Sequence, residues 1–287
     1  MPSSDSFFSI GTSHKICQDY AIAGAVKGTP FVAISDGCSS SPHTDFGSRF
    51  LCLAVQESLQ LLNTMNQEAI LPMACASVGK LLPWECLDAT LFTVHEDHNH
   101  DLDARLSGDG VMVARRKDGS FTVWDIEFNH NAPAYLSYQL NRQRLTTYLS
   151  GKLSIGVVGD QCGIRTIKRS TYGTDFLKLE WTNEVHTQEV VVGNPSTFWF
   201  SYLFGIDNVD TVAIFSDGVH SFQRKNSLGH LESIPLEEVL RQLMAFKGMK
   251  GEFVTRRCHK FFNKFCVENG WSHYDDFSMA AIYVGGD

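Results

Sequence analysis

The chain has 287 residues, of which 43% are hydrophobic and 20% charged, and its formal net charge is −8 at pH 7. This composition excludes a disordered chain, because it supplies enough apolar side chains for a sizeable core. The acidic charge and the lack of a basic patch argue against a nucleic-acid partner. No apolar run approaches the roughly 18 residues of a membrane span, so we expect no membrane partner either.

Eight cysteines are scattered along the chain without a Cys-x-x-Cys pair. Several of them, such as Cys52 and Cys266, fall in apolar stretches where a small hydrophobic side chain would pack. This pattern favours reduced thiols over a disulfide framework or a zinc site. The first residues also lack the basic and apolar blocks of a signal peptide, and together these features predict a cytoplasmic protein.

The first half of the chain shows strand-like patterns, then helical ones, then strands again. Short apolar and β-branched runs predict strands over residues 6–10, 20–26 and 30–35. From Thr44, apolar residues recur at helical spacing, and a second helical region, interrupted by proline, covers residues 67–82. Further strands are predicted over residues 88–94, 105–115 and 120–128, the last two joined by the hairpin signal Lys117-Asp118-Gly119.

The second half begins with a segment that has no firm period, residues 130–200, which predicts an insertion or flap. Pro235 and an acidic first turn begin a helix that we expect to end at Gly248. An apolar stripe beginning at Phe253 predicts another helix, ended by Gly270, and a last strand follows over residues 277–284. Because strands and helices do not alternate as in a parallel sheet, this order predicts an α+β fold with mainly antiparallel sheets.

Two apolar runs end at the same tripeptide, Ser-Asp-Gly. Residues 31–37 read Phe-Val-Ala-Ile-Ser-Asp-Gly, and residues 211–218 read Thr-Val-Ala-Ile-Phe-Ser-Asp-Gly. Each run predicts a strand buried on both faces, so that Asp36 and Asp217 stand at the edge of the core. Asp-Gly is also a common turn, but two copies behind the same kind of strand favour a site for hard cations, which prefer oxygen ligands.

Other aspartates stand at the edges of predicted strands. Asp19 precedes the second strand, Asp275 and Asp276 precede the last one, and Asp109 interrupts a strand between two glycines. Each of them alone would be read as an exposed turn carboxylate. Together with the twin motifs they form a set of carboxylates that would repel one another and need protons or cations.

The order of these motifs resembles that of the metal-dependent serine/threonine protein phosphatases, the type-2C or PPM family. Gly11-Thr-Ser-His14 followed by Cys17-Gln18-Asp19 is similar to a bacterial branch of that family. The motifs extend over residues 11–284, nearly the whole chain. The resemblance implies one metal-dependent phosphatase domain over residues 1–287, a β-sandwich of two antiparallel sheets flanked by helix pairs, with the flap or insertion within residues 130–200.

The resemblance also implies a role for each motif position in binding two Mn²⁺ or Mg²⁺ ions. Asp36 would bridge the two ions and act as a catalytic residue, and the Gly37 carbonyl would bind one of them. Asp217 and Asp275 would complete the shell of the other ion. Asp19 would bind directly or through water.

A third, weaker metal position would involve Asp109 together with Asp217. A water activated by the ions would hydrolyse phosphoserine or phosphothreonine in a phosphoprotein substrate. A serine/threonine kinase or its targets would then be the functional partners.

The sequence departs from the family pattern where the phosphate is handled. His14, with Lys15 beside it, replaces an arginine; both could bind phosphate and His14 is the predicted catalytic residue, although neither has the fork of arginine. Cys38 replaces a histidine general acid, so His43 or a water on the metal would have to supply the proton. Gln18 stands where many relatives have Glu, which would weaken one metal site.

Two other functions stay open. Loss of the arginine and histidine positions would suit a non-catalytic relative that binds phosphopeptides or regulates a kinase, whereas retention of Asp36, Asp217 and Asp275 argues against it. A calcium-binding β-sandwich used for adhesion fits poorly with reduced cysteines. The His-rich residues 95–103 are interpreted as a polar hairpin loop. The physiological substrate, the preferred ion, the general acid and the oligomeric state do not follow from the sequence.

Overall fold

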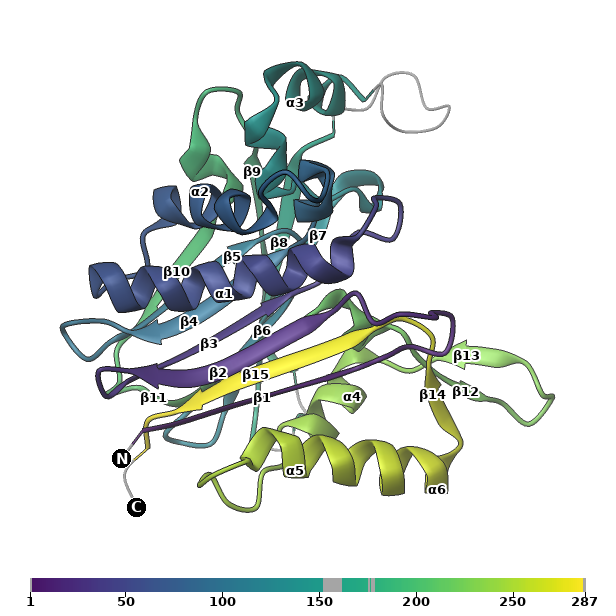
Figure 1. The fold of residues 1–287 in the computed structure, drawn as a ribbon. Helices are drawn as coiled ribbons and strands as arrows, with labels where there is room; N and C mark the ends of the chain where they lie inside the picture. The colour runs from purple at the N-terminus through teal and green to yellow at the C-terminus, as the bar shows by residue number, and fades with distance from the viewer. Residues whose placement is uncertain (1, 152–161, 175, 177–178, 286–287) are drawn as a thin grey trace.

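Two antiparallel sheets stacked face to face form the centre of the molecule in the computed structural model, which describes residues 2–151, 162–174, 176 and 179–285 (Figure 1). The five-stranded sheet contains, in spatial order, β10 (Phe200–Phe204), β5 (Leu102–Ser107), β4 (Leu91–Glu96), β3 (Thr29–Ser35) and β2 (Tyr20–Val26). The seven-stranded sheet contains β1 (Ser3–Ser9), β15 (Phe277–Tyr283), β11 (Val209–Phe215), β6 (Gly110–Arg116), β7 (Phe121–Phe128), β8 (Ile164–Tyr172) and β9 (Leu179–Glu189).

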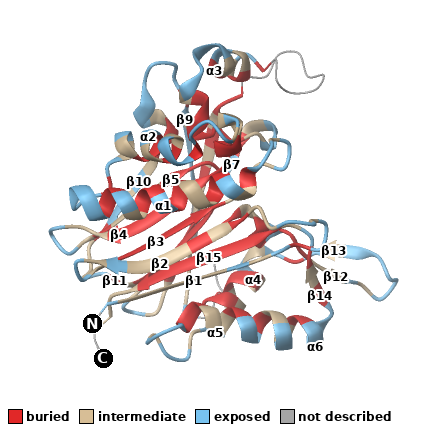
Figure 2. Cartoon of the chain, viewed as in Figure 1, coloured by how far each residue is buried: buried red, intermediate tan, exposed pale blue. Residues whose placement is uncertain are grey.

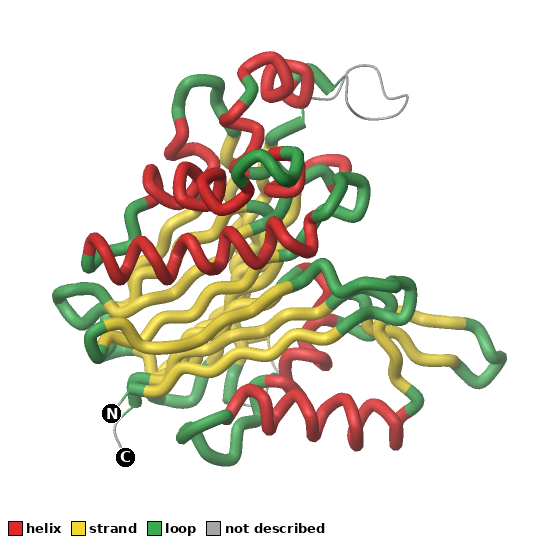
Figure 3. Tube along the Cα trace, viewed as in Figure 1, coloured by secondary structure: helices red, strands yellow, loops and turns green. Residues whose placement is uncertain are grey.

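Helices cover both outer faces of the sandwich, as Figure 3 shows by the strands at the centre and the helices outside them. α1 (Thr44–Leu62) and α2 (Gln67–Val78) pack on the five-stranded sheet. α4 (Leu236–Leu243) and α5 (Phe253–Lys260), which continues through a π-helical turn into α6 (Val267–Asn269), pack on the seven-stranded sheet. The predicted α+β sandwich flanked by helix pairs is confirmed.

Three apolar layers hold these four layers of secondary structure together, one between the sheets and one under each group of helices. The strands lie mostly within the buried part of the chain, whereas the helices bury one face each (Figure 2). No helix among the described residues is long and apolar enough to cross a membrane. None of the eight cysteines, all of which lie in the described part of the chain, is in a disulfide.

The elements with the strongest apolar patterns lie where they are predicted. β2 covers the predicted residues 20–26, β3 begins one residue before its predicted start, and α1 begins at Thr44. α4 ends at Leu243, so the predicted end at Gly248 is wrong. The chain also contains short strands that the sequence analysis does not predict, namely β10, β12 (Phe222–Lys225), β13 (Leu231–Ser233) and β14 (Trp271–His273).

The single strand predicted over residues 105–115 is wrong, because the chain changes sheets in its middle. β5 lies in the five-stranded sheet and β6 in the seven-stranded sheet, with Asp109 between them. Gly108 has φ +97° and Gly110 has φ +141°, values that L side chains rarely adopt. A Cβ on Gly110 would also lie 2.6 Å from the Phe215 carbonyl oxygen. The two glycines therefore permit the crossing that places Asp109 between the sheets.

Two further interpretations are refined by the structure. β8 and β9, from the predicted insertion, extend the edge of the seven-stranded sheet, and α3 (Arg142–Leu149) precedes them. Residues 152–161, 175 and 177–178 of that segment lie outside the described residues. The polar loop predicted for residues 95–103 is confined to residues 97–101, because His95 lies buried in β4 opposite Asp103 of β5.

A buried ion pair ties α3 to the sandwich. Asp88, whose side chain is fully buried, accepts hydrogen bonds from Arg144 Nη1 at 2.8 Å and Nη2 at 2.5 Å. The same carboxylate accepts bonds from Ser137 Oγ and Ser41 Oγ, each at 2.5 Å. The Arg144 guanidinium also lies 4.5 Å from the centre of the Tyr138 ring. Asp88 thus joins α3, the turn before it and the loop after Gly37.

Replacing Asp88 by Asn should lower the free energy of unfolding by about 2–3 kcal/mol, because Arg144 would keep its charge in a largely buried place without its partner. Chemical denaturation measures this loss. Asp210→Asn is the matched control, since Asp210 pairs with Arg115 at 2.7 Å with both side chains about a fifth exposed. We expect it to cost less than about 1 kcal/mol. Equal losses in the two variants would show that Asp88 has no special role.

Candidate functional site

The two Ser-Asp-Gly motifs end strands of opposite sheets and meet at one end of the sandwich. Asp36 follows β3 of the five-stranded sheet, and Asp217 follows β11 of the seven-stranded sheet. The carboxylates of Asp19 and Asp217 both lie within hydrogen-bonding reach of the Asp36 carboxylate. Three aspartates that are far apart in the sequence are therefore in contact.

These carboxylates lie in a poorly solvated place. Asp19 is fully buried, and its Oδ2 accepts a hydrogen bond from Ser216 Oγ at 2.7 Å. Burial raises the pKa of Asp19 to about 7, against the opposing effect of its hydrogen bonds. Burial, together with the charges of Asp19 and Asp217, raises the pKa of Asp36 well above its usual range. The cluster therefore needs protons or cations.

The donor set fits hard divalent cations. Asp19 Oδ1 and Asp217 Oδ1 are buried and accept no hydrogen bond from the described part of the chain, although buried polar atoms are normally paired. Carboxylate oxygens of this kind are the ligands that Mg²⁺ and Mn²⁺ prefer. Within the described ranges, no group of three or more His, Cys, Asp or Glu side chains is arranged to hold an ion as it stands. The aspartates instead contact one another.

Asp109 and Asp275 flank this cluster without joining the contact. Asp109 is 7% exposed, and burial followed by the charge of Asp217 raises its pKa. The Asp275 side chain is 39% exposed, and its pKa is raised by the same two causes. Gly37 is buried, and its N–H donates to the Gln18 carbonyl at 3.2 Å. The structure thus brings the predicted metal-binding residues to one end of the sandwich.

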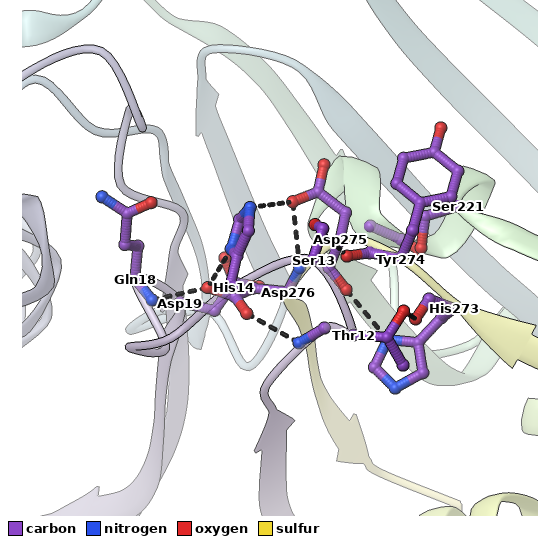
Figure 4. A network of polar contacts seen from close by, with 12 residues as sticks. Thr12, Ser13, His14, Gln18, Asp19, Ser221, His273, Tyr274, Asp275 and Asp276 are labelled. Atoms are coloured by element: carbon purple, nitrogen blue, oxygen red, sulfur yellow. Dashed lines mark hydrogen bonds and ion pairs between the residues drawn. The ribbon is translucent and has the colours of Figure 1, made fainter.

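His14 lies between two carboxylates of the last motif (Figure 4). Its Nδ1 is 2.9 Å from Asp276 Oδ2, and its Nε2 is 3.5 Å from Asp275 Oδ1. Asp276 is buried and also accepts from the N–H groups of Gly11 at 2.8 Å and Gln18 at 2.6 Å. Burial opposes the charge of His14, but Asp276 and the other carboxylates outweigh it and raise its pKa. His14 therefore forms ion pairs within the protein.

The other residues predicted to bind phosphate or to supply a proton lie at the same end of the molecule. Within the described part of the chain, their side chains form fewer ion pairs than His14 does. Lys15 is exposed and forms no ion pair with any residue that the structure describes. Cys38 is half-buried, with its Sγ 3.0 Å from Ser40 Oγ. His43 is exposed and precedes α1 in a left-handed conformation, with φ 59°.

Three residues near the cluster are absent from the sequence analysis. His220 follows Asp217 by one turn, and its Nε2 lies 3.0 Å from Asp125 Oδ1. Burial opposes the charge of His220, but Asp125 and then Asp217 outweigh it and raise its pKa. Tyr135, 8% exposed, lies near Cys38, and burial raises its pKa well above the usual range. Proximity to Asp217 could have drawn attention to His220, but nothing in the sequence indicates Asp125 or Tyr135.

Comparison with known proteins agrees with this arrangement. The sequence model of the family described as protein phosphatase 2C matches residues 10–132. No curated protein sequence is similar enough to match the chain. The match covers the motifs at Asp19, Asp36 and Asp109, which lie in the first half of the chain.

Solved structures of bacterial phosphatases share the fold at very low sequence identity. The serine/threonine phosphatase Stp1 from Staphylococcus aureus is 9% identical, with 100% of this chain and 96% of that chain covered and a TM-score of 0.51. A bacterial serine phosphatase is 10% identical, with coverages of 100% and 99% and a TM-score of 0.50. The chain spans 63% of a SpoIIE structure from Bacillus subtilis, which contains the PP2C phosphatase domain and a fragment of the regulatory domain, at 12% identity and a TM-score of 0.48.

In EDTA, the melting temperature should fall as the pH rises from about 5 to about 8. The pKa of Asp19 is about 7 in the folded protein and lower in the unfolded chain, so the folded state binds more protons in this window and loses stability as they leave. Millimolar Mg²⁺ or Mn²⁺ should restore the lost stability at pH 8. Thermal unfolding followed by circular dichroism measures both effects.

Two variants test which group causes this slope, the fall of the melting temperature with rising pH. Asp19→Asn should flatten it, because the group that titrates is gone. Asp118→Asn should leave it unchanged, since Asp118 is an exposed turn residue whose pKa is lowered by Ser120. A slope that survives in Asp19→Asn would assign the pH dependence to other groups.

Proposed function

We propose that this protein is a metal-dependent phosphatase that hydrolyses phosphoserine or phosphothreonine in phosphoproteins, with Mn²⁺ or Mg²⁺ as its cofactor. The contact of Asp19, Asp36 and Asp217, with two buried oxygens left without hydrogen bonds, carries the proposal. The match of residues 10–132 to the protein phosphatase 2C family model supports it. Eight cysteines without a disulfide support a cytoplasmic location, where a serine/threonine kinase or its targets would be partners.

The residues present would hold two ions, and a third at a weaker position. Asp36 would bridge the first two with the Gly37 carbonyl on one of them, and Asp217, Asp275 and Asp19 would complete the shells. Asp109 would share the third with Asp217. When bound, the ions would supply an acidified water as nucleophile and positive charge opposite the phosphoryl oxygens.

The protein holds its two central carboxylates by neighbouring hydroxyl groups and backbone. Ser216 donates to Asp19, and the Ser278 N–H donates to Ser216 Oγ at 2.9 Å. The Asp36 N–H donates to Thr90 Oγ1 at 3.0 Å, and the Thr90 N–H donates to the Asp36 carbonyl at 2.8 Å. These bonds fix the carboxylates before substrate arrives, which lowers the reorganisation needed during the reaction.

Other side chains can meet the phosphate and the leaving group. Lys15 offers an unpaired cation, and His14 offers one that Asp275 and Asp276 already share. His220, with its pKa raised beside Asp125, can hold a proton near neutral pH. His43 remains a second candidate for the proton.

The direct test is hydrolysis of p-nitrophenyl phosphate and of a phosphothreonine peptide in Mn²⁺, Mg²⁺ or EDTA. Turnover should require the metal, and Asp36→Asn and Asp217→Asn should each lower kcat by about 100-fold or more, because each removes charge from the site that holds the ions. Asp210→Asn, a carboxylate outside the cluster, should retain activity. Tight phosphopeptide binding without turnover would favour the non-catalytic relative instead.

A second experiment separates the roles of His14 and Lys15. Lys15→Gln should raise KM by about threefold to tenfold with little change in kcat, because it removes an unpaired cation that meets the substrate phosphate. His14→Gln should mainly lower kcat, because Asp275 and Asp276 would lose the cation between them. A rise in KM alone for His14→Gln would show instead that His14 anchors the phosphate.

A further inference from the structure

A pocket of about 490 Å³ lies at the end of the sandwich opposite the aspartate cluster. Arg116 and Lys117 line it at the end of β6, the strand that begins beside Asp109. Asn208 and Val209 line it at the start of β11, which leads to Asp217. Seven strand residues span about 20 Å, so a ligand in the pocket would not touch the cluster.

One wall of the pocket is aromatic. Trp124 of β7 has its ring centre 4.9 Å from that of Tyr202 and 5.4 Å from that of Phe204, both on β10. The rings of Tyr202 and Phe204 are 4.6 Å apart. Trp124 and Phe204 are almost fully buried, whereas Tyr202 is half-buried and forms the accessible part of the wall. Aromatic walls of this kind bind planar groups by stacking.

The rim of the pocket carries three cations. The side chains of Arg116 and Lys117 form no salt bridge with any residue described in the structure. Arg169 lies 5.6 Å over the Trp124 ring and pairs with Glu184 at 3.0 Å. In a chain with a net charge of −8, unpaired cations gathered around one pocket indicate an anionic ligand.

Two acidic residues also line the pocket, Asp118 and Asp207. Asp118 is engaged within its own turn, where its Oδ1 accepts from Ser120 N–H at 2.8 Å and from Ser120 Oγ at 2.6 Å. Among the residues that the structure describes, neither Arg116 nor Lys117 forms a salt bridge with Asp118 or with Asp207, so both cations stay available to a ligand.

Polar atoms without partners lie in the same wall. Thr122 is 1% exposed, and its Oγ1 has no hydrogen-bond partner among the described residues. The same holds for Arg169 Nε. A buried hydroxyl or guanidinium N–H without a partner costs free energy that a bound ligand can recover. Both residues line the pocket, so these buried atoms lie in the wall against which the ligand would rest.

We propose that this pocket binds a small phosphorylated molecule with a planar body, of the chemical class of a nucleoside monophosphate. Arg116 and Lys117 contact the phosphate, and the planar body lies against Tyr202. The volume lies within the roughly 300–1,000 Å³ typical of small-molecule sites. Charge-assisted bonds from arginine and lysine suit a phosphate, and the aromatic wall suits a base.

Isothermal titration of AMP into the full chain, in Mg²⁺, tests the proposal. AMP should bind, and the double variant Arg116→Gln, Lys117→Gln should weaken its affinity about tenfold or more. Thr122→Val, which keeps the shape and removes the hydroxyl, should weaken it by a smaller factor. Lys80→Gln, an exposed lysine remote from the pocket, is the matched control and should leave affinity unchanged.

Three comparisons make the test decisive. AMP should bind equally well to Asp36→Asn; loss of binding there would place the nucleotide at the aspartate cluster and overturn the proposal. Adenosine and inorganic phosphate should each bind more weakly than AMP, and equal affinity for phosphate would refute a role for the aromatic wall. Failure of AMP to bind at millimolar concentration, with circular dichroism showing a folded chain, would also overturn it.

Discussion

Three carboxylates in contact are the constraint around which this molecule is arranged. Two like charges about 4 Å apart repel by about 4 kcal/mol at an effective dielectric constant of about 20. Asp19, Asp36 and Asp217 are nevertheless brought together by β2, β3 and β11, whose apolar runs bury themselves between sheets and helices. The burial of these strands offsets the repulsion, and the remaining imbalance favours a bound cation or proton.

The motif residues are also held by contacts that do not touch the cluster. Asp88 joins the loop that follows Gly37 to the segment that carries Ser137 and Arg144, so the loop and that segment share one buried carboxylate. Tyr135 in the same segment lies near Cys38. The segment that carries Ser137 and Arg144 therefore contacts the loop that follows Asp36 and Gly37 through a few identifiable bonds.

Much of this could be predicted because it depends on local patterns. The apolar runs that end at Asp36 and Asp217 predict both their burial and their position at strand ends, and the structure places both at strand ends in one cluster. The roles of those aspartates as metal ligands, by contrast, stay predictions. The change of sheets at Asp109 is not visible in a hydrophobic pattern, because neither the alternating residues of β5 nor the apolar run of β6 tells which sheet a strand joins.

Pairs of side chains that lie far apart in the sequence could not be predicted from local patterns. Arg144 and Asp88 are separated by 56 residues, and His220 and Asp125 by 95. No spacing or periodicity relates such pairs; only the register of the sheets and the packing of the segments bring them together. β10 was not predicted for another reason: its residues Phe-Ser-Tyr-Leu-Phe fall at the end of a long segment without a firm period.

The placement of the twin aspartates in opposite sheets makes the centre sensitive to how those sheets slide over each other. Ile34 precedes Asp36 by two residues and Ile214 precedes Asp217 by three, and both side chains fill the layer between the sheets. Removing a methylene group there would let the layers shift, and the gap between carboxylates would shift with them. In the proposed metal-binding role, the affinity for cations would then depend on how tightly the layer between the sheets is packed.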